Sequence, residues 1–104
     1  MPHHIAIALR SESVSAVSSA LASRVNGALT KHSSSYLGLY DIVQGEERFL
    51  VRSNFVEEEG EWDYPELTDY STVVVVEETE RPDEVISTVT NLGYASVIAE
   101  NCEY

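Results

Sequence analysis

The chain has little positive charge. Of its 104 residues only six are lysine or arginine, against 18 aspartates and glutamates, so the net charge at pH 7 is −12. Binding to nucleic acid or to anionic lipid depends on cationic side chains that release counterions from phosphates. The charge balance therefore argues against both kinds of ligand and predicts that a macromolecular partner, if there is one, is basic.

Long apolar runs and paired cysteines are also missing. No apolar stretch approaches the roughly 20 residues that span a bilayer. The first residues (Met1-Pro2-His3-His4) carry neither a basic region nor a hydrophobic stretch of the kind that directs secretion. The single Cys102 has no second cysteine in the chain with which to form a disulfide. These absences predict a cytoplasmic protein that does not bind membranes.

What is present is the composition of one folded domain. A length of 104 residues is close to the commonest domain size. Hydrophobic residues make up 43% of the chain, which is too many for a disordered protein. We expect a single globular domain over residues 1–104, with a long acidic loop at 57–70.

The first quarter of the chain predicts a strand followed by a helix. Residues 4–10 alternate large and small apolar side chains, which suits a buried strand. Ser11 is a plausible N-cap, and the helix should end near Asn26-Gly27 or fray on to Thr30. The core-facing residues are Ile5, Ile7 and Leu9 in the strand and Val14, Val17, Leu21, Val25 and Ala28 in the helix.

The remaining periodic segments predict four strands and a second helix. Residues 35–43 and 48–56 read as a β-hairpin, and Gly38 inside it indicates a bulge or the close approach of another group. Residues 71–77 contain the run Val73–Val76, which fits a central strand covered on both faces. A helix begins near Pro82, with a buried stripe, and ends near Gly93; residues 94–100 form the last strand. The stripe consists of Val85, Ile86, Val89 and Leu92.

This order of elements, β-α-β-β-β-α-β, predicts an α+β sandwich of the ferredoxin-like plait type with one extra strand. Its two helices should cover one face of a mostly antiparallel sheet. The opposite face would then be open. We expect residues 57–70, a partner chain or a second copy in a homodimer to cover it.

The acidic stretch is the most informative feature of the sequence. Between Arg52 and Arg81 there is no cationic side chain. Residues 1–40 carry a net charge of +2 and residues 41–104 carry −14. Adaptation to high salt would acidify every exposed face, so this asymmetry favours a local patch. The patch contains Glu57, Glu58, Glu59, Glu61, Asp63, Glu66, Asp69, Glu77, Glu78 and Glu80, together with the aromatic residues Trp62, Tyr64 and Tyr70.

We interpret the patch as a binding site for a basic protein. Tryptophan and tyrosine are favoured as interface anchors, and an opposed electrostatic field raises association rates. A dense negative field suits the basic cleft of a nuclease or another nucleic-acid enzyme. The sequence thus favours an immunity protein or antitoxin, or a phage-type inhibitor, that acts without catalysis. A ligand-sensing or oligomerising plait is an alternative.

Catalytic and metal-binding patterns are weak. No serine, histidine and acid stand in a recognisable nucleophile context. His3 and His4 are adjacent, so on a strand their rings point to opposite faces. The acidic stretch lacks the spacing of a calcium-binding loop. The sequence therefore predicts no metal, no cofactor and no enzymatic activity.

One resemblance points to an enzymatic alternative. Met1-Pro2 followed by an alternating strand and a helix resembles the opening of the tautomerase superfamily, over about the first nine residues. In that family the exposed amino-terminal proline acts as a general base. The resemblance implies this role for Pro2, with Arg10, Arg24 or Arg52 binding the substrate anion.

Overall fold

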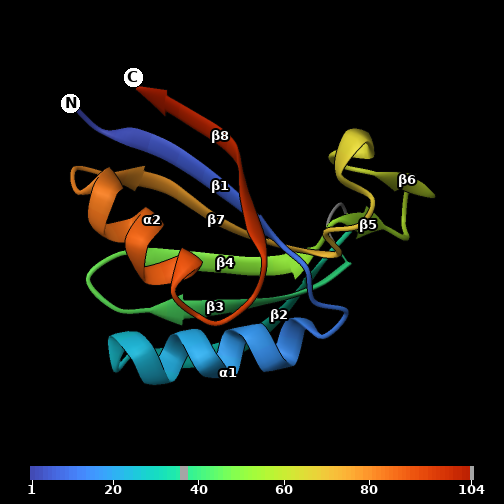
Figure 1. Cartoon of the computed structure of the whole chain (residues 1–104). Coiled ribbons are helices and arrows are strands. Elements are labelled where there is room, and N and C mark those ends of the chain that lie inside the picture. Colours follow the sequence, from blue (N-terminus) through green and yellow to red (C-terminus); the bar gives the residue numbers. More distant parts are fainter. Residues whose placement is uncertain (36–37, 104) are drawn as a thin grey trace.

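The computed structural model describes residues 1–35 and 38–103. Six strands form one sheet in the order β2-β3-β4-β7-β1-β8, and every neighbouring pair is antiparallel (Figure 1). Two further strands form a small separate sheet. In chain order the elements are β1 (His3–Leu9), α1 (Val14–Val25), β2 (Ala28–Ser34), β3 (Gly38–Gln44), β4 (Arg48–Ser53), β5 (Phe55–Val56), β6 (Glu61–Trp62), the short 3-10 helix η1 (Pro65–Leu67), β7 (Thr72–Thr79), α2 (Pro82–Thr90) and β8 (Ser96–Glu103).

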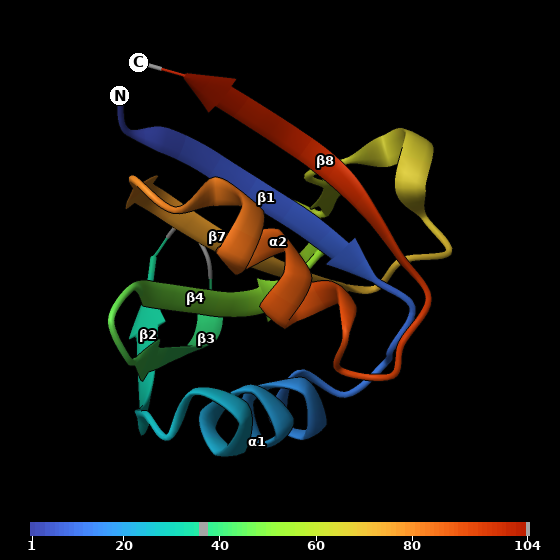
Figure 2. The same cartoon turned by 60° about the vertical axis from the view of Figure 1, so that its left-hand side comes forward.

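The fold is α+β, and its strand order and two helices are broadly compatible with a ferredoxin-like plait. β7 lies between β1 and β4, and β1 lies between β7 and β8. α2 therefore connects two strands, β7 and β8, that are separated by one other strand, as in a split β-α-β unit. α1 instead connects β1 to the edge strand β2, with β7, β4 and β3 between them. Figures 1 and 2 show α1 and α2 on the same side of the sheet, with the two chain ends side by side.

The main core lies between the sheet and these helices. Alternate residues of β1 face it, as predicted, and the apolar stripes of both helices pack onto it. Burying a side chain of this size contributes roughly 1.5–3 kcal/mol. The core consists of Ile5, Ile7, Leu9, Val17, Leu21, Val43, Phe49, Val51, Val74, Val76, Val85 and Val89.

The structure contains a strand that the sequence did not predict. Ser13, not Ser11, caps α1, and Asn26 ends it in the left-handed conformation (φ 52°). Because the chain turns directly after Gly27, the expected fraying to Thr30 is wrong and β2 begins at Ala28. β2 is an edge strand with exposed side chains along nearly all of its length, so it carries no apolar alternation. The predicted strand at 35–43 starts at Gly38 within the described residues; positions 36–37 lie outside them.

The acidic segment is more ordered than a long loop. The predicted strand at 48–56 stops at Ser53, and Phe55–Val56 instead pair with Glu61–Trp62 in the small β5–β6 sheet. η1 follows at Pro65–Leu67. β8 runs to Glu103, beyond the expected end at residue 100.

Residues that follow this hairpin cover part of the second face of the main sheet. Tyr64, Leu67 and Tyr70 pack against Leu50 and a short apolar cluster on the central strands, which consists of Ala6, Ala8, Val73 and Val75. The valine run of β7 is thus covered on both faces, as predicted. In the described part of the chain no helix is long and apolar enough to cross a membrane.

A single buried amide holds the acidic segment to the sheet. Asn54 is fully buried. Its Nδ2 donates hydrogen bonds to the carbonyls of Tyr64, Leu67 and Tyr70 at 3.1–3.3 Å, and its Oδ1 accepts one from the Tyr64 N–H at 2.9 Å. Its backbone N–H donates to the Ser71 carbonyl at 2.8 Å. Asn54 therefore satisfies the backbone of a segment that has little regular structure of its own.

An ion-pair cluster joins the β3–β4 turn to the start of α2. Arg81 donates to both carboxylate oxygens of Glu47, at 2.6 and 3.0 Å, and also contacts Glu46 at 2.9 Å. Thr79 donates a further hydrogen bond to Glu47 at 3.0 Å. The hydrogen bond from Arg81 is the main cause that lowers the pKa of Glu47 below its ordinary 4.5, against the opposing effect of burial.

We predict that Asn54→Asp lowers the free energy of unfolding by about 3 kcal/mol, because a carboxylate would face three carbonyl oxygens that have lost their donor. Urea denaturation followed by Trp62 fluorescence measures this change. Asn101→Asp is the matched control, since Asn101 is exposed on β8 and should change stability by less than about 0.5 kcal/mol. A loss at Asn54 no larger than that of the control would contradict the assignment.

We predict that Glu47 stabilises the fold in a pH-dependent way. Because its pKa is lowered in the folded state, the ionised form stabilises the fold above pH 4.5, and this contribution is lost as the pH falls through the lower, folded-state value. The difference in unfolding free energy between the unmodified protein and Glu47→Gln should be roughly 2 kcal/mol at neutral pH and should shrink at acidic pH. Glu46→Gln is the control, because the Glu46 side chain is 79% exposed against 10% for Glu47. Equal, pH-independent effects of the two variants would refute this role.

Candidate binding surface at the acidic hairpin

The part of the acidic stretch that projects from the body is the β5–β6 hairpin, residues 55–62, here called the acidic hairpin (Figure 1). Its turn is closed by the N–H groups of Glu59 and Gly60, which donate to the Val56 carbonyl at 3.1 and 2.9 Å. Gly60 has φ 66°, a conformation that favours glycine. The rings of Phe55 and Trp62 meet edge to face, with centroids 5.3 Å apart. The hairpin is thus held by its own packing and its turn.

Four carboxylates crowd this hairpin. Glu57, Glu58, Glu59 and Glu61 are all exposed, and no ion pair engages them within residues 1–35 and 38–103. Glu66, just beyond on η1, is exposed and equally without an ion pair in the described chain. Like charges this close raise the electrostatic energy of the folded state, and a cationic surface would relieve it.

Two other predicted partner-binding acids already have arginine partners within the protein. Asp63 forms an ion pair with Arg52, whose side chain is only 9% exposed. Asp69 lies 3.7 Å from Arg10, and the guanidinium of Arg10 sits 5.8 Å from the centroid of the Tyr70 ring. These acids help to fix the segment onto the sheet, so the exposed field is concentrated on the hairpin.

The predicted aromatic anchors serve the fold as well. Tyr64 and Tyr70 pack onto the second face of the sheet, and Trp62 packs on Phe55. All three remain half-buried rather than exposed. Their side chains therefore order the segment that carries the charges.

The last three predicted acids do not join the hairpin. β7 begins beside Ser53 and runs away from the hairpin, so that Glu78 and Glu80 lie roughly 20–25 Å further along the sheet. Figure 1 shows this end of β7 on the opposite side of the molecule from β5 and β6. The acids that form one patch in the sequence therefore lie on two separate surfaces of the folded protein.

Glu77 instead lines a hollow of about 360 Å³ on the second face of the sheet, together with His4, Glu100, Arg52 and Tyr64. His4 pairs with Glu100 at 2.9 Å. Burial, with the nearby charges of Glu100 and Asp63, raises the pKa of Tyr64 to about 12. At neutral pH its hydroxyl is therefore a hydrogen-bond donor and not a base.

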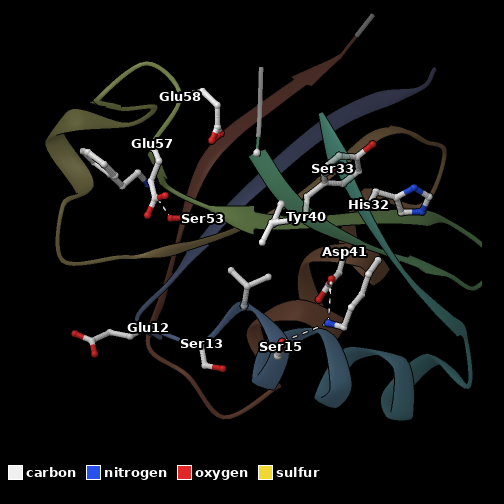
Figure 3. A pocket seen from close by; sticks show the side chains of 15 residues that line it. Glu12, Ser13, Ser15, His32, Ser33, Tyr40, Asp41, Ser53, Glu57 and Glu58 are labelled. Atoms are coloured by element: carbon white, nitrogen blue, oxygen red, sulfur yellow. Dashed lines mark hydrogen bonds and ion pairs between the residues drawn. The ribbon is translucent and has the colours of Figure 1, made fainter. Parts of the chain in front are cut away.

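A larger cavity, of about 600 Å³, opens beside the acidic hairpin (Figure 3). Its walls come from the first turn of α1, from β2 and β3, and from residues 53–58. Glu57 and Glu58 belong both to the hairpin and to the wall of this cavity. The hairpin and the cavity thus form one continuous surface.

Sequence reasoning missed two residues of this region and correctly read a third. Asn54 and Asp41 are buried polar residues within strand-like segments, where asparagine and aspartate are unfavourable, and that mismatch was the available signal. Gly38 has φ 70°, and the Glu58 carboxylate occupies the place where a Cβ atom on residue 38 would lie. The expected close approach at Gly38 is confirmed.

The residues weighed for catalysis are dispersed. Pro2 precedes β1, whereas Arg10 follows its other end, roughly 26 Å away along an extended strand. Arg24 lies in the last turn of α1, and Arg52 is engaged by Asp63. Within the described residues, no group of three or more histidine, cysteine, aspartate or glutamate side chains is arranged to hold a metal ion.

Comparison of the chain with protein-family models and with curated proteins gives no match. We therefore infer function from the geometry of this surface.

Proposed function

We propose that this protein is a small, non-catalytic binding protein that neutralises a basic protein partner through its acidic hairpin. The partner class that fits best is a toxin or another enzyme that acts on nucleic acid, because such proteins carry a positively charged cleft. The protein would then act as an immunity protein, an antitoxin or an inhibitor of that enzyme.

The observation that carries this proposal is the contrast between the acids on and off the hairpin. Asp63, Asp69 and Glu47 have arginine partners within the fold. The four hairpin glutamates have no such partner in the described chain, although they stand on a segment that is well packed at its base. An ordered surface with an unbalanced charge of one sign supports recognition of the opposite sign.

The mechanism would be electrostatic steering followed by occlusion. The negative field of the hairpin would speed the encounter with a basic cleft, and the projecting hairpin would then block access to it. Because the hairpin is held by the Phe55–Trp62 contact and the body behind it by Asn54, little ordering is needed on binding. A pre-organised surface loses less conformational entropy when it binds.

We predict that the double reversal Glu59→Lys and Glu61→Lys slows association with a basic nuclease about tenfold and flattens the dependence of the rate on salt. Stopped-flow or surface-based kinetics against a panel of purified basic nucleases, at low and at physiological ionic strength, measures this effect. The unmodified protein must bind at least one member of the panel at physiological ionic strength.

The matched control is Glu78→Lys with Glu80→Lys, which changes the net charge by the same amount at the other end of the sheet. This variant should leave the association rate within about twofold of the original. If both pairs slow association equally, binding reflects net charge alone and the hairpin is not the binding surface.

A further inference from the structure

The cavity beside the acidic hairpin contains an incompletely satisfied carboxylate. Asp41 lies on β3, is 5% exposed and lines the cavity wall. Its Oδ1 accepts from Lys31 Nζ at 3.4 Å, whereas its Oδ2 is buried and has no hydrogen-bond partner among residues 1–35 and 38–103. Buried carboxylate oxygens are ordinarily hydrogen-bonded, so an unpaired one calls for an explanation.

Lys31 is a weak and replaceable partner for Asp41. Its side chain is 69% exposed and reaches Asp41 and Ser15 only at 3.4 and 3.5 Å. Figure 3 shows Asp41 on β3 facing Ser15 on α1, with these two contacts drawn as dashed lines. An ammonium group is a point charge, and this one lies within hydrogen-bonding distance of only one of the two carboxylate oxygens.

The rest of the cavity offers more negative charge and an apolar wall. Glu57, Glu58 and Glu12 add three carboxylates to that of Asp41, against the single ammonium of Lys31. The first turn of α1 adds only about half a positive charge. The absence of a side chain at Gly38 lets the Glu58 carboxylate lie against the strand end. Leu39, which is 82% exposed, and Phe55 supply apolar surface at the same cavity.

We propose that this cavity binds the guanidinium group of an arginine side chain. A guanidinium presents two parallel N–H donors and so matches both oxygens of a carboxylate, which an ammonium does not. It would displace Lys31 toward solvent, pair with Oδ1 and Oδ2 of Asp41, and rest its aliphatic part on Leu39 and Phe55. The Glu58 carboxylate would balance the positive charge that the single Asp41 carboxylate leaves uncompensated. This inference rests on the proposed function, because the arginine would belong to the basic partner.

The test uses the 104-residue protein and three small probes: the N-acetyl amides of arginine, lysine and citrulline. Citrulline has nearly the shape of arginine but no charge. Titrations followed by amide NMR shifts should show saturable shifts around Asp41, Lys31 and Ser15 with the arginine probe. The arginine probe should bind about fivefold more tightly than the lysine probe, and the citrulline probe should not bind.

Variants identify the groups responsible. Asp41→Asn should lower the affinity for the arginine probe at least about tenfold. Since Asp41 is buried, Glu58→Gln provides a second test at an exposed residue and should lower the affinity about threefold, whereas Glu80→Gln, at an exposed residue at the other end of the sheet, should leave it unchanged. Equal affinities for arginine and lysine, or equal effects of Glu58→Gln and Glu80→Gln, would overturn the proposal.

The outcome is distinguishable from that of the partner-binding experiment. If the arginine probe fails while the hairpin charge reversal still slows association with a basic nuclease, the cavity proposal is wrong and the hairpin remains the binding surface. If the arginine probe binds but the hairpin reversal acts like its control, the cavity is a guanidinium site and the hairpin proposal is wrong.

Discussion

Because the side chain of Asn54 is fully buried, its amide must find hydrogen-bonding partners within the protein, and the backbone of residues 64–70 supplies them. The pairing of β4 with β7 ends at Ser53, directly before Asn54. The next residues then pair with Glu61 and Trp62 in a sheet of their own. The amide of Asn54 therefore joins the chain before the acidic hairpin to the chain after it and fixes the base of the hairpin on the main sheet.

The few cations of the chain are placed where they stabilise the structure. Four of the six form ion pairs in the described residues: Arg10, Lys31, Arg52 and Arg81. Their carboxylate partners lie at points where separate segments meet, such as the β3–β4 turn and the start of α2. None is on the acidic hairpin. The charge imbalance of the hairpin thus reflects an uneven distribution of partners as well as a shortage of them, and local repulsion is tolerated there because packing at its base opposes it.

The sequence predicted those parts of the fold that depend on periodic burial. β1, both helices and the valine run of β7 each place apolar residues on one or two buried faces, and pattern reading recovers such faces directly. β2 was not predicted because an exposed edge strand has no buried face to mark it. The division of the acids into paired and unpaired carboxylates was not predicted for a different reason. Asp63 and Glu61 are two residues apart, and only the three-dimensional position of Arg52 decides that one is paired and the other is not.

The hairpin and the cavity share residues, and their surface could act on a partner in two ways: through a long-range electrostatic field and through a hydrogen bond made at contact. A screened Coulomb field acts over about 8–10 Å at ordinary ionic strength, so glutamates at the hairpin tip would act on the proposed basic partner before contact. The proposed forked hydrogen bond to Asp41 would form only at contact and so would act on the lifetime of the complex. Glu57 and Glu58 line the cavity and belong to the hairpin, and they would therefore connect the two stages. A partner that presents an arginine at the edge of a basic cleft would use both stages, whereas a partner that is merely basic would use the first alone.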